Sequence, residues 1–287
     1  MKILITGGAG FIGSNLADRL ISDGHDVVIL DSMVSGKKEN VNPKAKLFTG
    51  DIRDYDDISS SMKGCQAVFH LAAMSDAREE GDQNYNVNFL GAKNVFDIAK
   101  ENNAKIIFTS SAAVYGDIHG ACKETDKCEP LSEYGKNKLR AERAAGENAF
   151  IVRMFNVYGP RGNSVVNRFC ERIPEYKEIH VFGNGLQTRD FVHVNDVADV
   201  LVMGLDKDGL YNVGTGVETS ILNLIDMIFA MTRNKPNARH DQEHKEIKRS
   251  KADITKLKAM GWEPKISLKD GVKSLLKQRG VKLAGEF

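Results

Sequence analysis

The chain opens with MKILITGGAGFIG, residues 1–13, in which a short apolar strand runs directly into Gly7, Gly10 and Gly13. Glycines at this spacing permit a tight turn, a close approach of backbone to phosphate, and close packing of the next helix on the strand. The helix that starts near Phe11 directs its unpaired N–H groups and its positive dipole end at the same point. The stretch predicts a site for the pyrophosphate of a dinucleotide, with a glycine-rich turn that binds nothing as the alternative.

The second strand-like run ends in an acidic residue. A helix is predicted over residues 14–22 with a stop at Gly24, and residues 26–30 then form a strand that leads into Asp31. A carboxylate at this place can accept hydrogen bonds from both hydroxyls of an adenosine ribose, whereas it would repel a 2′-phosphate. Asp31 therefore favours NAD over NADP, and a solvated carboxylate at a strand end is the alternative.

The composition is that of an ordinary globular protein. The chain has 287 residues, of which 41% are hydrophobic and 28% are charged, and its formal net charge is +1. This length allows one large domain or two smaller ones, and the charge gives no electrostatic reason to expect nucleic acid or a membrane surface as a partner. Since we find no membrane-spanning run and no signal peptide, we expect a cytoplasmic protein.

The cysteines indicate neither disulfides nor a metal site. Cys65, Cys122, Cys128 and Cys170 lie far apart and form no CxxC pair, which is typical of reduced thiols in a reducing compartment. His119 lies near two of them, but the spacing matches no zinc pattern. We expect chemistry without a metal.

Apolar strand-like runs alternate with helical stretches through the first half of the chain. This rhythm predicts an α/β fold with a Rossmann-type doubly wound parallel sheet. The predicted strands are residues 3–5, 27–30, 46–49, 67–71, 105–109 and 149–154. The predicted helices between them are residues 14–22, 58–62, 86–102 and 134–147. In such a sheet, ligands bind beyond the carboxyl ends of the strands.

The rhythm breaks after residue 157, where loops rich in glycine and proline begin. We therefore expect an NAD-binding domain over residues 1–157, with returns to it near 190–215, and a smaller, interleaved α/β substrate lobe over residues 158–287. The lobe has predicted helices at residues 165–173, 195–205 and 221–231. The charged stretch 236–250 is either a ligand-contacting loop or a solvated surface loop.

A tyrosine and a lysine lie four residues apart in one predicted helix. Tyr134 and Lys138 therefore share a helix face, and an ammonium near a phenol favours the phenolate, so that the tyrosine can act as a general base. A surface pair is the alternative. The strand 105–109 opens into Ser110 and Ser111, and a hydroxyl at that strand end can orient a substrate alcohol and pass its proton to Tyr134.

The motifs, taken in order, resemble one family. GGAGFIG, Asp31, Asp51-Ile52, HLAA at 70–73, SSAAVYG, YGKNK, RMFNVYGPRG and RDFVHVND are similar to those of extended short-chain dehydrogenases/reductases. Within that family the chain resembles nucleotide-sugar epimerases of the UDP-glucose 4-epimerase type. The match runs from Met1 to about Ala198 and continues more loosely to Asp253.

The resemblance implies a role for each matching position. Ser111, Tyr134 and Lys138 would be the catalytic residues. The cofactor-binding residues would be Gly7, Gly10, Phe11, Ile12, Gly13, Asp31, Ser32, Met33, Ser35, Gly36, Asp51, Ile52, Leu71, Ala72, Ala73, Ser75, Asn88, Ser110, Tyr134, Lys138 and Phe155. The substrate-binding residues would be Ser111, Asn156, Phe182, Gln187, Arg189 and Arg249. Arg189 also fits on physical grounds, because a guanidinium binds phosphate oxygens through two hydrogen bonds.

The implied reaction is the inversion of C4 in a UDP-sugar, through a transient 4-keto sugar, with NAD that stays bound and is regenerated in each turnover. Relatives that dehydrate or decarboxylate the sugar carry an acidic residue just after the serine or threonine, where this chain has Ala112 and Ala113. A 4-keto-sugar reductase or another nucleotide-sugar enzyme of the family is the first alternative. A non-catalytic NAD-binding regulatory protein is the second. The sugar and the base, uracil or thymine, stay open.

Two further expectations come from the resemblance. The arginine that usually pairs with the diphosphate aligns with Glu243, so Arg239, Lys245, Lys248 or Arg249 would replace it. Relatives form homodimers through two helices, and we expect the same for this chain. The residues that could serve such a contact are Phe89, Val95, Phe96, Leu139 and Ala144, although packing in the core explains most of them equally well.

Overall fold

The computed structural model describes residues 1–74, 82–118, 120–242 and 247–285. The chain forms two compact units and crosses between them repeatedly. The first unit consists of Met1–Gly116, Glu124–Met154 and Val197–Asn212. The second unit consists of Asp117–Lys123, Phe155–Asp196 and Val213–Phe287.

A seven-stranded sheet organises the described part of the first unit, in the order β10-β6-β5-β4-β1-β2-β3. The pairs from β3 across to β6 are all parallel. The strands are β1 (Lys2–Thr6), β2 (Asp26–Asp31), β3 (Lys46–Thr49), β4 (Ala67–His70), β5 (Lys105–Ser111), β6 (Phe150–Met154) and β10 (Gly209–Val213). The order reverses between β1 and β4, which confirms the predicted doubly wound Rossmann-type fold.

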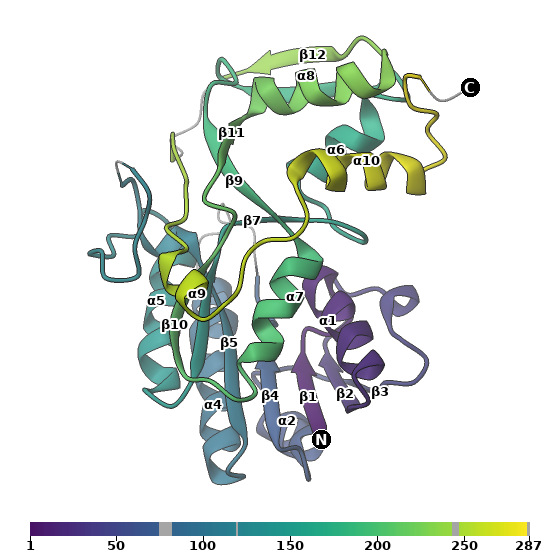
Figure 1. Ribbon diagram of the computed structural model, residues 1–287. Coiled ribbons are helices and arrows are strands. Elements are labelled where there is room, and N and C mark those ends of the chain that lie inside the picture. Colours follow the sequence, from purple (N-terminus) through teal and green to yellow (C-terminus); the bar gives the residue numbers. More distant parts are fainter. Residues whose placement is uncertain (75–81, 119, 243–246, 286–287) are drawn as a thin grey trace. The chain divides into compact units, whose positions relative to one another are not determined.

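Helices cover both faces of this sheet (Figure 1). One face carries α2 (Tyr55–Met62), α4 (Ala92–Glu101) and α5 (Glu133–Ala145), which contact one another in sequence. On the other face, an ion pair between Arg19 and Asp199 joins α1 (Phe11–Ser22) to α7 (Val194–Met203). The apolar strand residues pack under α2, α4 and α5 in one buried cluster that includes Leu4, Val68 and Phe108. The long apolar runs of the sequence are thus strands buried on both faces.

The predicted helices and strands are present, with shifts at their ends, but residues 237–241 of the predicted loop 236–250 form a strand that pairs with residues 178–182. The helix expected over residues 58–62 begins at Tyr55, because the carboxylate of Asp54 accepts hydrogen bonds from the N–H groups of Asp56 and Asp57 and caps it earlier. The range 86–102, expected as one helix, contains a π-helical turn, η2 (Asn86–Gly91), followed by α4. A short helix, α3 (Asp82–Tyr85), precedes it. Periodicity alone does not reveal such a turn.

Short 3-10 turns complete the first unit. They are η1 (Lys38–Asn40), which follows β2, and η3 (Ala112–Val114), which follows β5. The hydroxyl of Ser111 caps η3 by accepting a hydrogen bond from the N–H of Ala113 at 3.2 Å.

The glycine turn packs too closely for side chains. Gly7 has φ +73°, and a Cβ on it would lie 2.7 Å from the backbone nitrogen of Ala72, at the end of β4. A Cβ on Gly13, in α1, would lie 2.3 Å from the carbonyl oxygen of Gly7. These approaches press α1 onto β1 and leave its first N–H groups directed beyond the strand ends.

The second unit combines small sheets with helices. Its strands are β7 (Asn156–Tyr158), β8 (Glu178–Phe182), β9 (Thr188–His193), β11 (Glu218–Ser220) and β12 (Asn237–Asp241). Its helices are α6 (Val165–Arg172), α8 (Ile221–Thr232), α9 (Thr255–Ala259) and α10 (Leu268–Gln278). The described strands pair as β11-β9-β7 and as β12-β8. Apolar side chains from α6, α8 and α10 form the core, with Phe169, Leu224 and Leu276 among them.

Two of the residues named for a contact between subunits belong to the core instead. Val95 and Phe96 of α4 are completely buried within the first unit. Phe89, Leu139 and Ala144 are partly exposed. Since buried side chains cannot meet a partner, the alternative of core packing holds for Val95 and Phe96, and the homodimer itself stays a prediction.

Of the helices in the described ranges, none is both long and apolar enough to cross a bilayer.

We predict that Gly13→Ala lowers the free energy of unfolding by about 2–3 kcal/mol, because its methyl group would overlap the Gly7 carbonyl. Urea denaturation measures this change. Gly24→Ala is the control, since Gly24 has φ +85° but open space around it, and backbone strain alone should cost about 1 kcal/mol. Equal losses in the two variants would contradict the packing argument.

Candidate active site

The N-terminus of α1, together with the glycine turn before it, fits the pyrophosphate of a dinucleotide. Among the described residues, no side chain caps α1, whose N-cap Gly10 is extended. The N–H groups of Phe11, Ile12 and Gly13 therefore remain directed at a ligand, where the helix dipole favours a phosphate. A side chain at Gly7 or Gly13 would overlap the backbone atoms that shape this turn.

Asp31 lies beside the glycine turn. It ends β2, it is 7% exposed, and its two carboxylate oxygens accept hydrogen bonds from the N–H groups of Ala9 and Met33, both at 2.9 Å. Each oxygen keeps a second lone pair, so the carboxylate can still accept a ribose hydroxyl. Gly36 lies against it, since a Cβ there would be 2.6 Å from Asp31 Oδ1.

Asp51 is a half-buried ion-pair partner rather than an open acceptor. Its carboxylate accepts hydrogen bonds from Arg53 Nε at 3.0 Å and Nη2 at 2.6 Å, and this pairing holds the carboxyl pKa below its usual range. The neighbouring Ile52 is 5% exposed and packs in the core. The predicted contact of both residues with adenine stays a prediction.

The ends of β1 and β4 are joined by buried polar side chains. Thr6 Oγ1 and His70 Nδ1 lie 2.7 Å apart, and the N–H of Ala72 donates to the same Thr6 oxygen at 3.4 Å. His70 is 1% exposed and stacks on the Phe108 ring. Burial, with a smaller contribution from the charge of Lys138, lowers the His70 pKa well below its usual range. The imidazole is therefore neutral.

Asn88 anchors the segment that follows β4. Its amide bonds the backbone of Met74 twice, accepting from the N–H and donating to the carbonyl, both at 2.9 Å. The π-helical turn carries this side chain, which is 1% exposed. The turn thus fixes the stretch that contains the predicted cofactor contacts Leu71, Ala72 and Ala73. Ser75, also predicted, lies outside the described residues.

The predicted catalytic residues come together in the first unit. Ser111 ends β5, and Tyr134 lies in the first turn of α5, which the Ser132 hydroxyl caps by accepting from the N–H of Gly135 at 3.1 Å. The Ser111 hydroxyl lies close enough to the Tyr134 phenol to favour its ionised form. The Lys138 ammonium lies 5.9 Å from the centre of the Tyr134 ring.

A glycine makes this approach possible. Gly135, next to Tyr134, has no side chain, and a Cβ there would lie 2.5 Å from the carbonyl oxygen of Ala113. The first turn of α5 therefore rests directly on the backbone of η3. This contact positions the Tyr134 phenol beside Ser111.

The expected lowering of the Tyr134 pKa is wrong, because burial has the opposite effect. Burial raises the pKa of Tyr134 to about 12, although the hydrogen bond with Ser111 lowers it in part. Burial lowers the pKa of Lys138 to about 7, against the opposing effect of the Glu142 carboxylate. The same desolvation that stabilises the neutral phenol thus also removes much of the lysine charge on which the expectation depended.

Lys138 is nevertheless held in a fixed place. It is 2% exposed, and Nζ donates to the carbonyl oxygen of Thr109 at 2.9 Å. The ammonium also lies 4.9 Å from the centre of the Phe108 ring. Ser110, predicted as a cofactor contact, is completely buried, and its hydroxyl donates to Glu142 at 2.5 Å.

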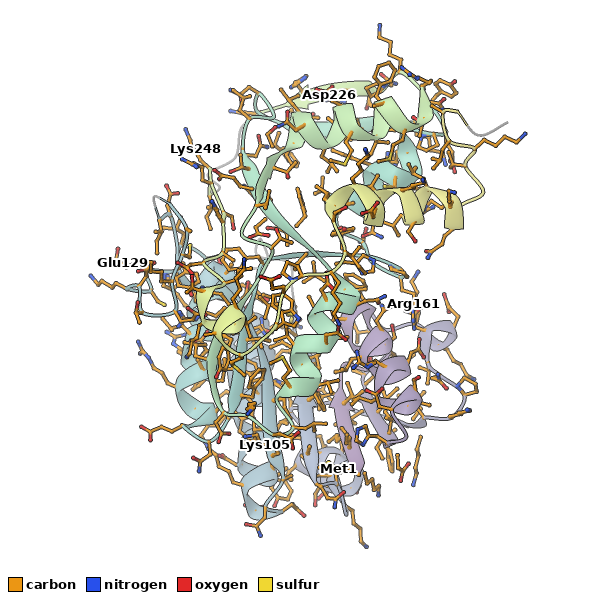
Figure 2. All side chains as sticks on the ribbon, viewed as in Figure 1. Met1, Lys105, Glu129, Arg161, Asp226 and Lys248 are labelled. Atoms are coloured by element: carbon orange, nitrogen blue, oxygen red, sulfur yellow. The ribbon has the colours of Figure 1, made fainter. Side chains whose placement is uncertain are left out.

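The second unit brings together three of the predicted substrate residues. Phe182, Gln187 and Arg249 line a cavity of about 220 Å³. Its other lining residues are Gly183, Asn184, Leu186 and Lys248, the last of which is labelled in Figure 2. This volume is below the usual range for a drug-sized ligand, so the cavity suits one part of a larger molecule, such as a base.

Hydrogen bonds shape this cavity. Gln187 Nε2 donates to the carbonyl oxygen of Phe182 at 2.9 Å, and the N–H of Thr188 donates to the carbonyl oxygen of Lys248 at 2.9 Å. Arg249 pairs with Glu218, which holds the Glu218 pKa below its usual range. A phosphate would have to compete with this carboxylate for the Arg249 guanidinium.

The remaining predicted substrate residues lie elsewhere in the second unit. Asn156 and Arg189 are on β7 and β9 and do not line the cavity. Arg189 Nη1 donates to the carbonyl oxygen of Thr188 at 2.8 Å. Phe155, predicted near the nicotinamide, is 6% exposed. Glu243 and Lys245 lie outside the described residues.

A buried carboxylate, that of Asp190, joins β9 to two other segments of the second unit. Asp190 is completely buried and accepts four hydrogen bonds, from the N–H and the hydroxyl of Thr215, both at 2.7 Å, and from the N–H groups of Gly216 at 2.9 Å and Ala252 at 3.1 Å. Asp190 lies in the RDFVHVND motif, but the sequence analysis predicted no role for it. An acidic residue inside an apolar strand was the available signal.

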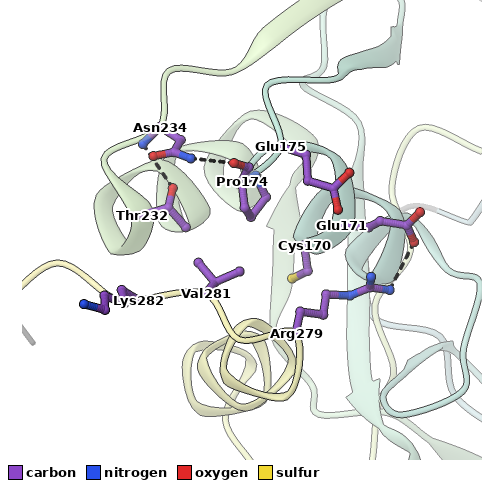
Figure 3. Close-up of a pocket in the computed structure, with 9 residues that line it drawn as sticks. All are labelled: Cys170, Glu171, Pro174, Glu175, Thr232, Asn234, Arg279, Val281 and Lys282. Carbon is purple, nitrogen blue, oxygen red and sulfur yellow. Dashed lines mark hydrogen bonds and ion pairs between the residues drawn. The ribbon is translucent and has the colours of Figure 1, made fainter.

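A larger cavity of about 280 Å³ in the second unit contains none of the predicted site residues (Figure 3). Its polar groups already pair with one another. Glu171 bonds Arg279 at 3.0 Å, and Asn234 donates to the carbonyl oxygen of Pro174 at 2.7 Å. We assign it no role.

Comparison with known proteins identifies the family. The model of the NAD dependent epimerase/dehydratase family matches residues 3–214. The chain belongs to this family. A putative UDP-glucose 4-epimerase of Methanocaldococcus jannaschii is 38% identical over 295 residues, which cover 96% of this chain and 97% of that protein. UDP-glucuronic acid decarboxylase 1 of Arabidopsis thaliana is 33% identical, over 95% of this chain and 68% of that protein.

A solved structure has the same fold. The crystal structure of UDP-glucose 4-epimerase with UDP-glucose from Thermotoga maritima has a TM-score of 0.92 and 32% identity, and the match covers 98% of this chain and 99% of that chain. The family match confirms the resemblance, the expectation of an epimerase-like enzyme, and NAD as the cofactor.

We predict that Gly135→Ala lowers kcat at least about tenfold, because the new methyl group pushes Tyr134 away from Ser111. Alanine is the better helix former by about 1 kcal/mol, so helix propensity works against this loss. Steady-state kinetics measure kcat, and Lys136→Ala, an exposed change one residue further along α5, is the control. An active Gly135→Ala variant would refute the close-contact argument.

Proposed function

We propose that the protein interconverts the C4 epimers of a UDP-hexose, of the UDP-glucose and UDP-galactose type, through a transient 4-keto sugar. The observation that carries the proposal is the placement of Tyr134 beside both Ser111 and Lys138, at a strand end that continues into Ala112 and Ala113. This arrangement provides a base for a sugar hydroxyl but no additional carboxylate for elimination.

Residues of the first unit would hold the cofactor. The N–H groups of Phe11, Ile12 and Gly13 would bind the pyrophosphate, and Asp31 would accept the adenosine ribose hydroxyls. When bound, NAD supplies a hydride acceptor and a positive charge. NAD that is regenerated in each turnover has no need to leave, and we propose that it stays bound.

Tyr134 would take the proton of the sugar 4-hydroxyl, directly or through Ser111, and return it at the end of the cycle. Because burial raises the pKa of the phenol to about 12, the phenol needs added positive charge to ionise near neutral pH. Lys138, whose ammonium lies 5.9 Å from the centre of the Tyr134 ring, would bind the nicotinamide ribose. Burial of the pair keeps water from competing for the proton.

Residues of the second unit would bind the nucleotide. The Phe182 ring offers a face on which a uracil can stack, and Gln187 lies beside it in the same cavity. Arg189 and Asn156 would contact the diphosphate. Lys248 and Arg249 add positive charge at the cavity, and both were among the residues expected to replace the missing arginine.

The strongest competing reaction is decarboxylation, because a UDP-glucuronic acid decarboxylase is among the similar proteins. Decarboxylases that the chain resembles carry an acidic residue just after the serine or threonine. Ala112 and Ala113 stand there in this chain, which favours epimerisation.

We predict that purified protein converts UDP-galactose to UDP-glucose without added NAD and without a net change in absorbance at the NADH wavelength. Chromatography of the nucleotide sugars measures the conversion. UDP-glucuronic acid should release no carbon dioxide. A net absorbance change would favour a reductase, and released carbon dioxide would favour a decarboxylase.

We predict that Tyr134→Phe lowers kcat by about 10²–10⁴-fold, since the phenol is the proposed base. The folded state should be retained, because the ring remains in place. Tyr85→Phe, which removes an exposed hydroxyl from another helix, should leave kcat unchanged. Full activity of Tyr134→Phe would show that another group takes the proton.

A further inference from the structure

A third polar side chain extends the catalytic face of α5. Tyr134, Lys138 and Glu142 follow at intervals of four residues, so they lie on one face of the helix. Lys138 is 2% and Glu142 is 8% exposed. A carboxylate buried this deeply is costly unless it is paired and fully hydrogen-bonded.

Glu142 is tied to two strands of the sheet. Its Oε1 accepts from the Ser110 hydroxyl at 2.5 Å and from Arg153 Nε at 3.0 Å, and its Oε2 accepts from Arg153 Nη2 at 2.8 Å. Ser110 directly precedes Ser111 on β5, and Arg153 lies on β6. One carboxylate therefore connects the helix of the base to the strand of the catalytic serine.

Arg153 is enclosed in turn. Its guanidinium carbon lies 4.7 Å from the centre of the Tyr115 ring, and Nη1 donates to the carbonyl oxygen of Glu124 at 3.3 Å. The Tyr115 hydroxyl donates to Asn212 at 2.6 Å. Both oxygens of Glu142 are thus paired with the Arg153 guanidinium, and the carboxylate lies one helical turn from Lys138 on the same face of α5.

We propose that Glu142 is a positioning residue of the reaction: its carboxylate fixes Ser110 and the face of α5 that carries Tyr134 and Lys138 against β5 and β6, and it places a buried negative charge one helical turn from Lys138. This role rests on the proposed function, because it concerns the base and its lysine. It adds a residue that touches neither substrate nor cofactor.

The electrostatic part follows from the surroundings of the lysine. Burial lowers the Lys138 pKa to about 7, and the Glu142 carboxylate raises it from the still lower value that burial alone would give. The His70 imidazole, from β4, is neutral. The charged or titratable groups around Lys138 and Glu142 are Tyr134, Arg143, His70, Tyr115, Arg153, Cys128 and Glu124.

The sign of the pH effect is fixed. An ammonium that loses a nearby carboxylate becomes more acidic, so Lys138 would lose its proton at a lower pH. The alkaline side of the pH profile of kcat then moves to lower pH. A shift of one pH unit makes kcat about twofold lower at pH 6 and about tenfold lower at pH 9.

The first experiment compares Glu142→Gln with the unaltered protein, in pH profiles of kcat and in NMR titrations of the protein labelled with carbon-13 at lysine Cε. Lys138→Arg identifies the Lys138 signal. We expect the titration midpoint of Lys138 to fall by about one pH unit, together with the stated changes in kcat. An unchanged midpoint and an unchanged profile would overturn the proposal.

The control is Glu147→Gln, which removes an exposed carboxylate just beyond the end of α5 and should change neither readout. Glu142→Asp keeps the charge and should restore the pH profile even if kcat stays low. A purely structural role for Glu142 predicts the opposite, namely a lower kcat at every pH with the profile in place. That result would overturn the electrostatic part.

Should Glu142→Gln fail to fold, Ser110→Ala tests the positioning part, because it keeps the Glu142–Arg153 ion pair. We expect about a tenfold loss of kcat with little change in KM and no shift of the pH profile. Unchanged kcat would overturn this part. The lysine titration needs no turnover, so a fall in its midpoint without any epimerase activity would refute the proposed function and leave the role of Glu142 standing.

Discussion

The structure depends on how closely backbone approaches backbone at the carboxyl ends of the parallel strands. Gly7 and Gly13 bring β1, α1 and the end of β4 within distances that a single methyl group would violate, and Gly135 does the same for α5 and the turn after β5. Both close backbone contacts lie at the carboxyl ends of the strands of the same sheet. One leaves helix N–H groups open to a pyrophosphate, and the other places a phenol beside a serine.

Each unit adds a buried carboxylate that ties distant segments together. Glu142 joins α5 to β5 and β6 in the first unit, and Asp190 joins β9 to the backbone of residues 215, 216 and 252 in the second. The two carboxylates satisfy their oxygens differently. Glu142 is paired with a cation and affects the charge of Lys138, whereas Asp190 is held by dipoles and orders loops near the Phe182 cavity.

Much of the fold and part of the candidate site could be predicted from the sequence, because the effect of an apolar run or a glycine depends mainly on its immediate neighbours in the chain. The sheet, the glycine turn and the i, i+4 spacing of Tyr134 and Lys138 are of this kind. The charge states were not predictable in the same way. The pKa values of Tyr134 and Lys138 depend on burial, which only the assembled fold sets, and the partners of Glu142 and Asp190 lie 11 to 62 residues away. The π-helical turn at Asn86–Gly91 leaves no distinct periodicity.

The interleaving of the two units has a consequence for synthesis of the protein on the ribosome. The first unit needs only the chain up to residue 212, whereas the second is assembled from three separate stretches that end at the last residues. Asp190 receives its final hydrogen bond from Ala252, so a nascent chain carries this carboxylate incompletely paired until some sixty more residues have emerged. The first unit can therefore mature first, while the second unit waits for the stretch that contains Ala252.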